Sequence, residues 1–280
     1  MNNSVFSPAK INLTLNILKL REDNYHELDS VFAKINFGDY LTFTEKKESI
    51  EIKSKGEFKI PTNKDNLVFK AADLLRTKAK GKKGIKIEIE KNIPIGSGLG
   101  GGSSNAATTL KFLNTFWDIN LSNDKLCEIG AKIGADVPFF INELTFAHIS
   151  GIGDKIEKVI YPREIFGGLE QTEIIVLLII PKYISINTSW AYSELKKYFK
   201  EKYPNSISNS NTFEKIIFEI YPDLKFFKET FLNNGAIHSN MTGSGSAVFG
   251  IFEKSKNLLE IEKKLKNKGD LISCAFSKEV

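Results

Sequence analysis

The feature that most constrains the fold is a run of glycines that leads directly into a helical pattern. The sequence PIGSGLGGGSSNAA spans Pro94 to Ala107 and places five glycines within seven positions. Glycine loses more conformational entropy on folding than any other residue, so this run indicates a backbone shape or a close approach that a Cβ atom would prevent. The next segment, SSNAATTLKFLNTFW, has apolar residues at helical spacing. We therefore expect a glycine loop that opens into a helix N-terminus.

Several known loops could account for these glycines. Gly96, Gly98 and Gly101 satisfy G-x-G-x-x-G, but a dinucleotide-binding loop follows a parallel strand buried on both faces. The preceding segment, IKIEIE, alternates and so has one solvated face. A Walker loop needs a Lys-Ser/Thr pair that the run lacks, and flexible linkers rarely run into an Ala-rich helix. We expect a phosphate-binding loop of another design, in which backbone N–H groups and the helix dipole bind anionic oxygens.

Length and composition are those of a soluble globular protein. The 280 residues suffice for two domains or one large one. The longest apolar run, IIVLLII at residues 174–180, is too short to span a membrane and predicts a buried strand. Cys127 and Cys274 lack metal-ligand spacing, and the N-terminus has no signal-peptide pattern. We therefore expect a cytoplasmic protein without a membrane partner.

The charge pattern argues against a nucleic-acid partner. The net charge is +5, and the lysines are spread in pairs such as residues 46–47 and 82–83. No stripe of basic and aromatic residues accompanies them, so a solvated lysine-rich surface is the preferred interpretation. The isoelectric point near 8.9 and the strand-rich start leave RNA binding as an alternative, which salt-dependent RNA affinity would reveal.

The pattern of elements predicts a mixed α and β chain. Strands are expected at residues 10–17, 31–37, 40–46, 49–54, 57–60 and 85–90, separated by Gly and Asp turns. Helices are expected at 66–80, capped by Asp65 and ended by GKKG, at 103–117 and at 123–133. A boundary is expected within 159–173. The second half should contain the strand 174–180, helices near 188–199, 211–219 and 223–233, a hairpin at 241–252, a helix in 255–267 and a strand at 271–277. The polar stretch 196–215 has no recognisable motif.

Two charged residues are candidates for chemistry. Lys10 and Asn12 alternate with Ile11 and Leu13, so they point to the same side of a strand. Asp136 lies among apolar residues in IGADVPFFI. Taken alone, a lysine protecting a sheet edge and an aspartate capping a turn before proline are the ordinary interpretations. Together they match phosphoryl transfer to an alcohol, which requires charge compensation and a carboxylate that accepts or orients the hydroxyl proton.

The sequence resembles the GHMP kinase family of small-molecule kinases. The motifs that carry the resemblance are PAKINLTLNI at 8–17, YHELDSVF at 25–32, DNLVFKAADLL at 65–75, the glycine loop, GADVPFF at 134–140, GIGDKIEKV at 151–159 and TGSGSAVF at 242–249. The resemblance runs nearly end to end, and the order of the motifs makes it specific. It implies an α+β, two-domain GHMP kinase fold, with a ribosomal-protein-S5-domain-2-like N-terminal α/β domain and a ferredoxin-like C-terminal α+β domain.

The resemblance assigns roles to individual residues. It implies that Lys10 and Asp136 are catalytic and that Asn12 binds the substrate. The loop would bind the phosphates of ATP through Pro94, Ile95, Gly96, Ser97, Gly98, Leu99, Gly100, Gly101, Gly102, Ser103 and Ser104. The Ser103 and Ser104 hydroxyls could bind phosphate, ligate Mg²⁺ or cap the helix. The protein ligands of Mg²⁺ stay unassigned.

The resemblance also implies a cytosine pocket. Tyr25 would stack on the base and His26 would hydrogen-bond it. A second aromatic from SINTSWAY should close the pocket, with Tyr192, four residues after Thr188, preferred over Trp190 and Tyr183. Thr188 and the turn glycines Gly243 and Gly245 are expected near the substrate.

The implied reaction uses ATP with Mg²⁺ to phosphorylate the 2-hydroxyl of a cytidine-diphosphate methylerythritol in the non-mevalonate isoprenoid pathway. Residues 1–160 would form the ATP-binding domain, and residues 161–280 would help to bind the substrate. The expected state is a monomer or homodimer. The alternatives are another GHMP kinase acting on a mevalonate-, homoserine- or sugar-type alcohol, and an NAD-dependent oxidoreductase suggested by G-x-G-x-x-G.

Overall fold

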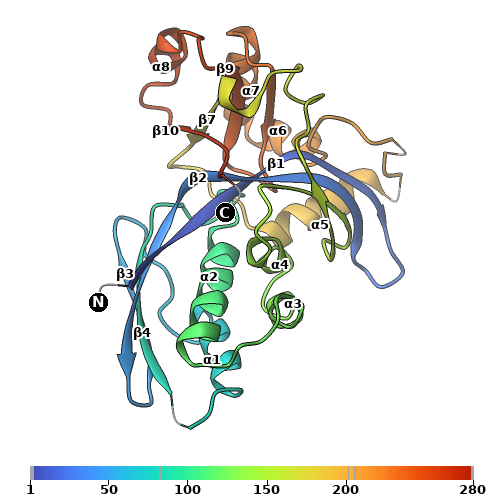
Figure 1. Ribbon diagram of the computed structural model, residues 1–280. Coiled ribbons are helices and arrows are strands. Elements are labelled where there is room, and N and C mark those ends of the chain that lie inside the picture. Colours follow the sequence, from blue (N-terminus) through green and yellow to red (C-terminus); the bar gives the residue numbers. More distant parts are fainter. Residues whose placement is uncertain (1–2, 82, 201, 205, 279–280) are drawn as a thin grey trace.

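An N-terminal sheet is built around two long strands. The computed structural model describes residues 3–81, 83–200, 202–204 and 206–278. In this part of the chain, β1 (Asn3–Leu20) pairs antiparallel with β2 (His26–Lys46). The other strands are β3 (Ile50–Lys55), β4 (Gly84–Glu90), β5 (Phe146–Gly151) and β6 (Lys155–Val159), in the order β3-β4-β2-β5-β6. Figure 1 shows β1 and β2 running side by side across the middle of the molecule.

The expectation of separate strands at 31–37 and 40–46 is wrong. Gly38 and Asp39 lie within β2, where the register against β1 shifts between Pro8 and Ala9 instead of the chain turning. The Asp39 carboxylate is fully buried and accepts hydrogen bonds from the backbone N–H groups of Asn92 and Ile93, both at 2.8 Å. The chain therefore continues as one strand, β2, through the position where a turn was expected. The expected strand at 57–60 is absent as well, since those residues form a bend and irregular backbone.

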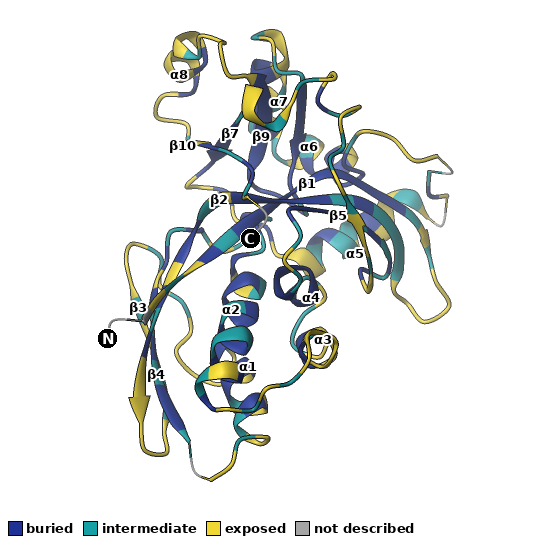
Figure 2. Cartoon of the chain, in the orientation of Figure 1, coloured by how far each residue is buried: buried dark blue, intermediate teal, exposed yellow. Residues whose placement is uncertain are grey.

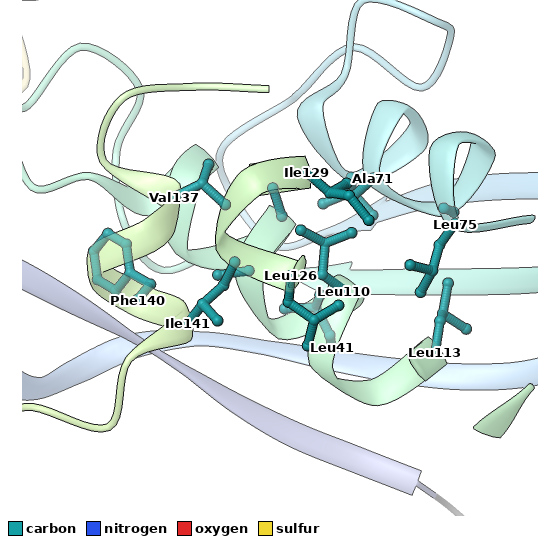
Figure 3. Close-up of a cluster of buried hydrophobic side chains, with 14 of the residues drawn as sticks. Leu41, Ala71, Leu75, Leu110, Leu113, Leu126, Ile129, Val137, Phe140 and Ile141 are labelled. Atoms are coloured by element: carbon teal, nitrogen blue, oxygen red, sulfur yellow. The ribbon is translucent and has the colours of Figure 1, made fainter. Parts of the chain in front are cut away.

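Four helices cover one face of this sheet. They are α1 (Leu67–Arg76), α2 (Gly101–Phe116), α3 (Asn123–Ala131) and α4 (Val137–Ile141). Leu75, Leu110, Leu126 and Ile141 meet over the sheet residue Leu41 in one buried cluster (Figure 3). Alternation along β4 puts Ile85, Ile87 and Ile89 into the same core, as its sequence predicts.

The start of the first helix differs from its prediction by one residue. The N-cap of α1 is Asn66, not Asp65, because the Asn66 side chain accepts from the N–H of Val68 at 2.8 Å. Of the GKKG segment expected to end this helix, Lys82 lies outside the described residues.

A second sheet forms the C-terminal half. Its order is β10-β7-β9-β8, all antiparallel, with β7 (Ile174–Ile180), β8 (His238–Met241), β9 (Val248–Glu253) and β10 (Asp270–Cys274). A short 3₁₀ turn, η1 (Gln171–Glu173), precedes it, and α5 (Thr188–Phe199), α6 (Glu214–Ile220), α7 (Pro222–Asn233) and α8 (Leu259–Leu265) complete this half. The apolar run 174–180 is a buried central strand, as predicted.

Strand β1 contributes to both halves. Leu15 and Ile17 lie in the C-terminal core, whereas Ile11 and Leu13 lie in a core between the two sheets. Figure 2 shows the middle of β1 and β2 as buried, between regions with exposed loops. Because β1 packs with both halves, the core clusters do not mark a boundary between two domains. The predicted boundary between residues 160 and 161 stays a prediction. Among the described residues, no helix combines the length and apolar character that crossing a membrane requires.

Candidate functional site

A cavity of about 450 Å³ lies between the two halves. Its wall includes the glycine loop, the middle of β1, the start of α1, Asp136 before α4, and parts of the C-terminal half. The lining residues with a predicted role are Lys10, Asn12, Pro94, Ile95, Gly96, Ser97, Gly98, Leu99, Gly100, Gly101, Gly102, Ser103, Asp136, Thr188, Tyr192 and Gly243. The structure thus brings most of the predicted site residues into one space.

Two of the loop glycines are required by packing inside the protein. Gly96 and Gly98 have φ of +70° and +76°, a left-handed conformation that side chains disfavour. A Cβ on Gly98 would lie 2.0 Å from the carbonyl oxygen of Thr242, and one on Gly96 would lie 2.3 Å from Ser185 Oγ. These glycines let the loop press against the C-terminal half, a role that their sequence pattern did not predict.

The N-terminus of α2 is the part of the loop that is open to a ligand. Gly100 occupies the N-cap with φ of +72° and makes no side-chain capping bond. The first N–H groups of a helix lack intrahelical partners and carry its partial positive charge. Gly102 is exposed, and a Cβ there would meet only Leu67 Cδ1, at 3.5 Å. Packing within the described part of the protein therefore does not explain this glycine.

The two serines after the loop have different surroundings. Ser103 lines the cavity. Ser104 is fully buried, its Oγ lies 2.8 Å from Ser7 Oγ, and its N–H donates to Gly100 O at 2.9 Å. Ser103 is therefore the serine with a hydroxyl near the ligand space, while Ser104 joins α2 to β1.

Lys10 and Asp136 form the charged centre of the cavity. Lys10 Nζ lies 3.7 Å from Asp136 Oδ2 and donates to Asn12 Oδ1 at 2.6 Å. Lys10 is 3% exposed, so it does not act as a lysine at a solvated sheet edge. Burial lowers the pKa of Lys10, and the Asp136 charge partly opposes that shift. Asp136 stands at the N-cap of α4 without a side-chain capping bond, and its side chain is 34% exposed. Its carboxylate therefore faces Lys10 and the cavity.

Asn12 holds the two halves together at this centre. Its Oδ1 accepts from the N–H of Gly243 at 2.8 Å as well as from Lys10, and its own N–H donates to Thr242 Oγ1 at 3.0 Å. Its Nδ2 donates to Ser30 Oγ at 3.1 Å. The side chain that was predicted to bind substrate therefore also positions the Lys10 ammonium.

An aromatic cluster adjoins the cavity at Tyr192. Tyr192 lines the cavity, and the ring of His26, which is not part of the cavity wall, lies 5.0 Å from the ring of Tyr192. Burial raises the pKa of Tyr192, and the charge of Asp136 raises it further. Burial lowers the pKa of His26, with a smaller contribution from Lys196, so its ring is neutral near pH 7. Tyr25 is 60% exposed and is not part of the cavity wall.

The remaining predicted substrate residues divide into two groups. Thr188 lines the cavity and its Oγ1 lies 3.2 Å from Ser244 Oγ. Gly245 does not line the cavity. It packs against the core residues Ile186 and Met241, each of which would lie 2.8 Å from an added Cβ. The rival aromatics also lie elsewhere: Tyr183 donates to Asp223, and Trp190 packs edge-on against Tyr221.

Tyr203 is a neighbour of His26 that the sequence analysis did not predict. Its hydroxyl lies 2.8 Å from His26 Nε2, and the two rings are 5.5 Å apart. It belongs to the polar stretch 196–215, in which residues 201 and 205 lie outside the described part. Residues 208–212 of this stretch lie along β1, where Leu15 donates to Ser210 O and Thr212 donates to Leu15 O.

A buried polar network beneath the loop was also missed. Lys91 Nζ donates to Asp39, and Asn105 Nδ2 donates to the same carboxylate at 2.9 Å. Burial lowers the pKa of Lys91, and Asp39 partly opposes that shift. The sequence did contain a sign that Lys91 is buried. Lys91 is the next residue after Ile87 and Ile89 in the alternation that faces the core. Lys91 and Asn105 both line the cavity, behind the start of α2.

The comparisons with known proteins agree with this geometry. The model of the GHMP kinases N terminal domain matches residues 66–143, and that of the GHMP kinases C terminal matches residues 192–271. A 4-diphosphocytidyl-2-C-methyl-D-erythritol kinase of Chloroherpeton thalassium is 36% identical over a 270-residue alignment that covers 90% of this chain and 90% of its own. The chain belongs to the GHMP kinase family. The resemblance and the two-domain α+β class expected from the sequence are confirmed.

Further relatives of this GHMP kinase carry the same name. A 4-diphosphocytidyl-2-C-methyl-D-erythritol kinase of Acinetobacter baumannii is 38% identical over 92% of this chain and 90% of its own. A crystal structure of a 4-(cytidine 5'-diphospho)-2C-methyl-D-erythritol kinase superposes with a TM-score of 0.78 at 26% identity, covering 98% of this chain and 99% of its own. The mevalonate kinase of Methanococcus jannaschii has the same fold, with a TM-score of 0.68 at 18% identity and 99% of each chain covered.

The sheet around the loop excludes the dinucleotide-binding interpretation. The strand before the loop, β4, pairs parallel with β3 but antiparallel with β2, and the other pairings of this sheet are antiparallel, whereas a dinucleotide-binding loop belongs to a mostly parallel sheet. The family membership of this GHMP kinase is consistent with that exclusion.

Proposed function

We propose that this GHMP kinase transfers the γ-phosphate of ATP to the 2-hydroxyl of 4-diphosphocytidyl-2-C-methyl-D-erythritol, a step in non-mevalonate isoprenoid biosynthesis. The observation that carries the substrate assignment is the 36–38% identity, along about nine-tenths of the chain, to kinases that bear this substrate's name. The observation that carries the chemistry is the Lys10–Asp136 pair beside the N-terminus of α2 in one cavity.

The phosphates of ATP bind at the start of α2. The backbone N–H groups of Gly101, Gly102 and Ser103 donate to phosphate oxygens, and the helix dipole favours their negative charge. The approach is close because Gly102 leaves the first turn uncovered. Buried Lys91 lies next to Gly101 behind the helix, where the Asp39 carboxylate balances its charge.

Asp136 and Lys10 act on the acceptor. Asp136 accepts or orients the proton of the attacking hydroxyl, and Lys10 stabilises the negative charge that develops on the transferred group. The transition state of phosphoryl transfer is loose, so holding the hydroxyl in line with the γ-phosphate is the larger part of the task. Asn12 fixes Lys10 for this purpose through its 2.6 Å hydrogen bond.

Magnesium accompanies ATP in this proposal. Hydroxyl and carboxylate oxygens are the ligands that Mg²⁺ prefers, and Ser103 and Asp136 supply one of each in the cavity wall. No group of three His, Cys, Asp or Glu side chains that could hold a metal is found among the described residues. Phosphate oxygens and water would therefore complete its coordination.

The cytidine group is held at the far end of the cavity. His26 and Tyr192 form the walls of the base site, Thr188 and Gly243 contact the acceptor, and Tyr25 covers the base from the exposed hairpin between β1 and β2. A cytoplasmic location, a monomer or homodimer, and the absence of nucleic-acid and membrane partners stay predictions.

A panel of acceptors tests this function. The full chain with Mg²⁺ and ATP should phosphorylate 4-diphosphocytidyl-2-C-methyl-D-erythritol, with one ADP formed per phosphomonoester. Mevalonate, homoserine and galactose at the same concentration should give no product. Turnover of one of these alcohols in preference to the cytidine compound would instead assign a different specificity within the GHMP kinases.

A further inference from the structure

A second cavity lies on the other side of α4 from the active site. It encloses about 640 Å³. Its apolar wall is formed by Val5, Phe6, Phe112, Phe140 and Leu144, and its charged wall by Lys34, Lys111, Glu143 and Lys278. We call this space the Lys34 cavity. Phe140 separates it from the active site, because a Cβ on Gly100 would lie 3.1 Å from the Phe140 ring.

Lys34 is a buried cation without an ionic partner. The residue is 7% exposed, and its Nζ donates to the carbonyl oxygen of Asn142 and lies 5.1 Å from the centre of the Phe139 ring. Among the described residues, no carboxylate forms an ion pair with it. The one carboxylate in the cavity wall, Glu143, is bound by Lys111 at 2.7 Å. A buried charge is costly to leave unpaired, so this ammonium favours an anion in the cavity.

The remaining wall specifies the rest of the ligand. Three lysines and one glutamate make the charged side net positive, while the opposite side is aromatic and aliphatic. A small inorganic anion would pair with the lysines but would leave the apolar wall exposed to water. A ligand with one anionic group and a hydrocarbon body would pair with Lys34 and bury the apolar wall at the same time.

We propose that the Lys34 cavity is a second ligand site, which binds a small amphiphilic anion, a carboxylate or phosphate monoester on an apolar chain. The site does not overlap the ATP and acceptor cavity, so it binds its ligand whether or not the kinase holds nucleotide. Its affinity depends on Lys34, which plays no part in the proposed chemistry.

Calorimetric titration of the full chain tests this site with octyl phosphate, octanoate and uncharged octanol. Titrations are made with and without saturating ATP and Mg²⁺. We expect at least one of the two anions to bind with an affinity unchanged by ATP. Octanol should bind at least about tenfold more weakly, because it cannot form a charge-assisted hydrogen bond with the Lys34 ammonium. Binding of one anion only identifies the headgroup that the site takes.

Variants separate the role of the ammonium from that of the cavity. Lys34→Met and Lys34→Gln should each weaken anion binding about tenfold or more while kinase activity is retained, which shows that the variants are folded. Lys264→Met removes a lysine from the exposed face of α8 and should change nothing. Absence of anion binding, equal affinity for octanol, competition with ATP, or full binding to both Lys34 variants would overturn the proposal.

Discussion

Asp136 is the residue whose chemistry is most open to a direct test. It precedes Val137 and Pro138 at the start of α4, where an aspartate commonly caps the helix, yet it makes no side-chain capping bond. Its carboxylate instead lies 3.7 Å from the Lys10 ammonium. Replacing it should therefore affect catalysis more than the stability of this short helix.

Asp136→Asn should lower kcat by about 10²–10⁴-fold, because the amide cannot accept the hydroxyl proton. The KM for ATP should stay within about threefold, since the amides at the start of α2 are untouched. Steady-state kinetics with both substrates measures the two effects. Asp124→Asn, in the first turn of α3, is the matched control and should behave like the unaltered protein. A kcat near normal for Asp136→Asn would remove Asp136 from the proposed mechanism.

Lys34 makes the stability of the protein depend on pH. Burial and the nearby charge of Lys111, partly opposed by Glu143, together lower the pKa of Lys34 to about 8. The unfolded chain still holds the proton until about pH 10.4, so the free energy of unfolding rises with pH between these two values. Below pH 8 both states are charged, and the folded state bears the full cost of burying the charge.

Lys34→Met should therefore raise the free energy of unfolding at pH 7 by about 1–3 kcal/mol in the absence of ligand. The difference between the variant and the unaltered protein should shrink as the pH rises from 8 to 10.4. Urea denaturation of both proteins across this pH range measures the difference in their free energies of unfolding. Titratable groups that the two proteins share contribute equally to both and do not affect this difference. A difference that does not vary with pH would contradict the lowered pKa.

At the scale of elements, the glycine loop serves two purposes at different positions. A Cβ added to Gly98 would clash with the carbonyl oxygen of Thr242. A Cβ added to Gly102 would meet no atom of the described residues closer than 3.5 Å. The two glycines should therefore respond in opposite ways to the same added methyl group.

Gly102→Ala should raise the KM for ATP about tenfold or more while leaving or increasing the melting temperature, because Ala gains about 0.5–1 kcal/mol over Gly in a helix. Gly98→Ala should lower the melting temperature, because its Cβ would meet a backbone oxygen at a left-handed φ. Thermal melts and ATP kinetics of both variants provide the measurement. An unchanged KM for ATP in Gly102→Ala would argue that the phosphates bind elsewhere.

The segment after α5 brings the Tyr203 hydroxyl against His26, a residue of the proposed base site. Tyr203→Phe should raise the KM for the cytidine substrate several-fold, because His26 loses the 2.8 Å hydrogen bond that orients its ring. The KM for ATP should not change. Tyr198→Phe, on the exposed face of α5, is the control. Equal effects of Tyr203→Phe on both substrates, or no effect, would contradict a role in base recognition.

The elements whose patterns are local could be predicted from the sequence. The alternation of residues 85–90, the apolar run 174–180 and the helix after the glycine loop all lie where their spacing indicated. The Lys10–Asp136 contact followed from the family resemblance. Features that depend on distant pairings could not be predicted in this way: Asp39 as the partner of Lys91, Gly98 against Thr242, and Tyr203 beside His26.

At the scale of the whole molecule, β1 connects the two halves and carries the centre of the site. Its residues Lys10 and Asn12 lie between the glycine loop on one side and Thr242 and Gly243 on the other. The apolar residues of the same strand pack into the C-terminal core and into the core between the two sheets. Both substrates are therefore expected to meet along β1, each held by elements from both sides of the cavity.

In the proposed mechanism, the start of α2 binds the polyphosphate next to the Lys10–Asp136 pair. A crystal structure of the full chain with a non-hydrolysable ATP analogue, Mg²⁺ and the cytidine acceptor tests it most directly. We predict that the terminal phosphate lies against the backbone amides of residues 101–103, with the acceptor hydroxyl between it and Asp136. A polyphosphate bound away from residues 94–104, or an acceptor hydroxyl out of reach of Asp136, would contradict the account.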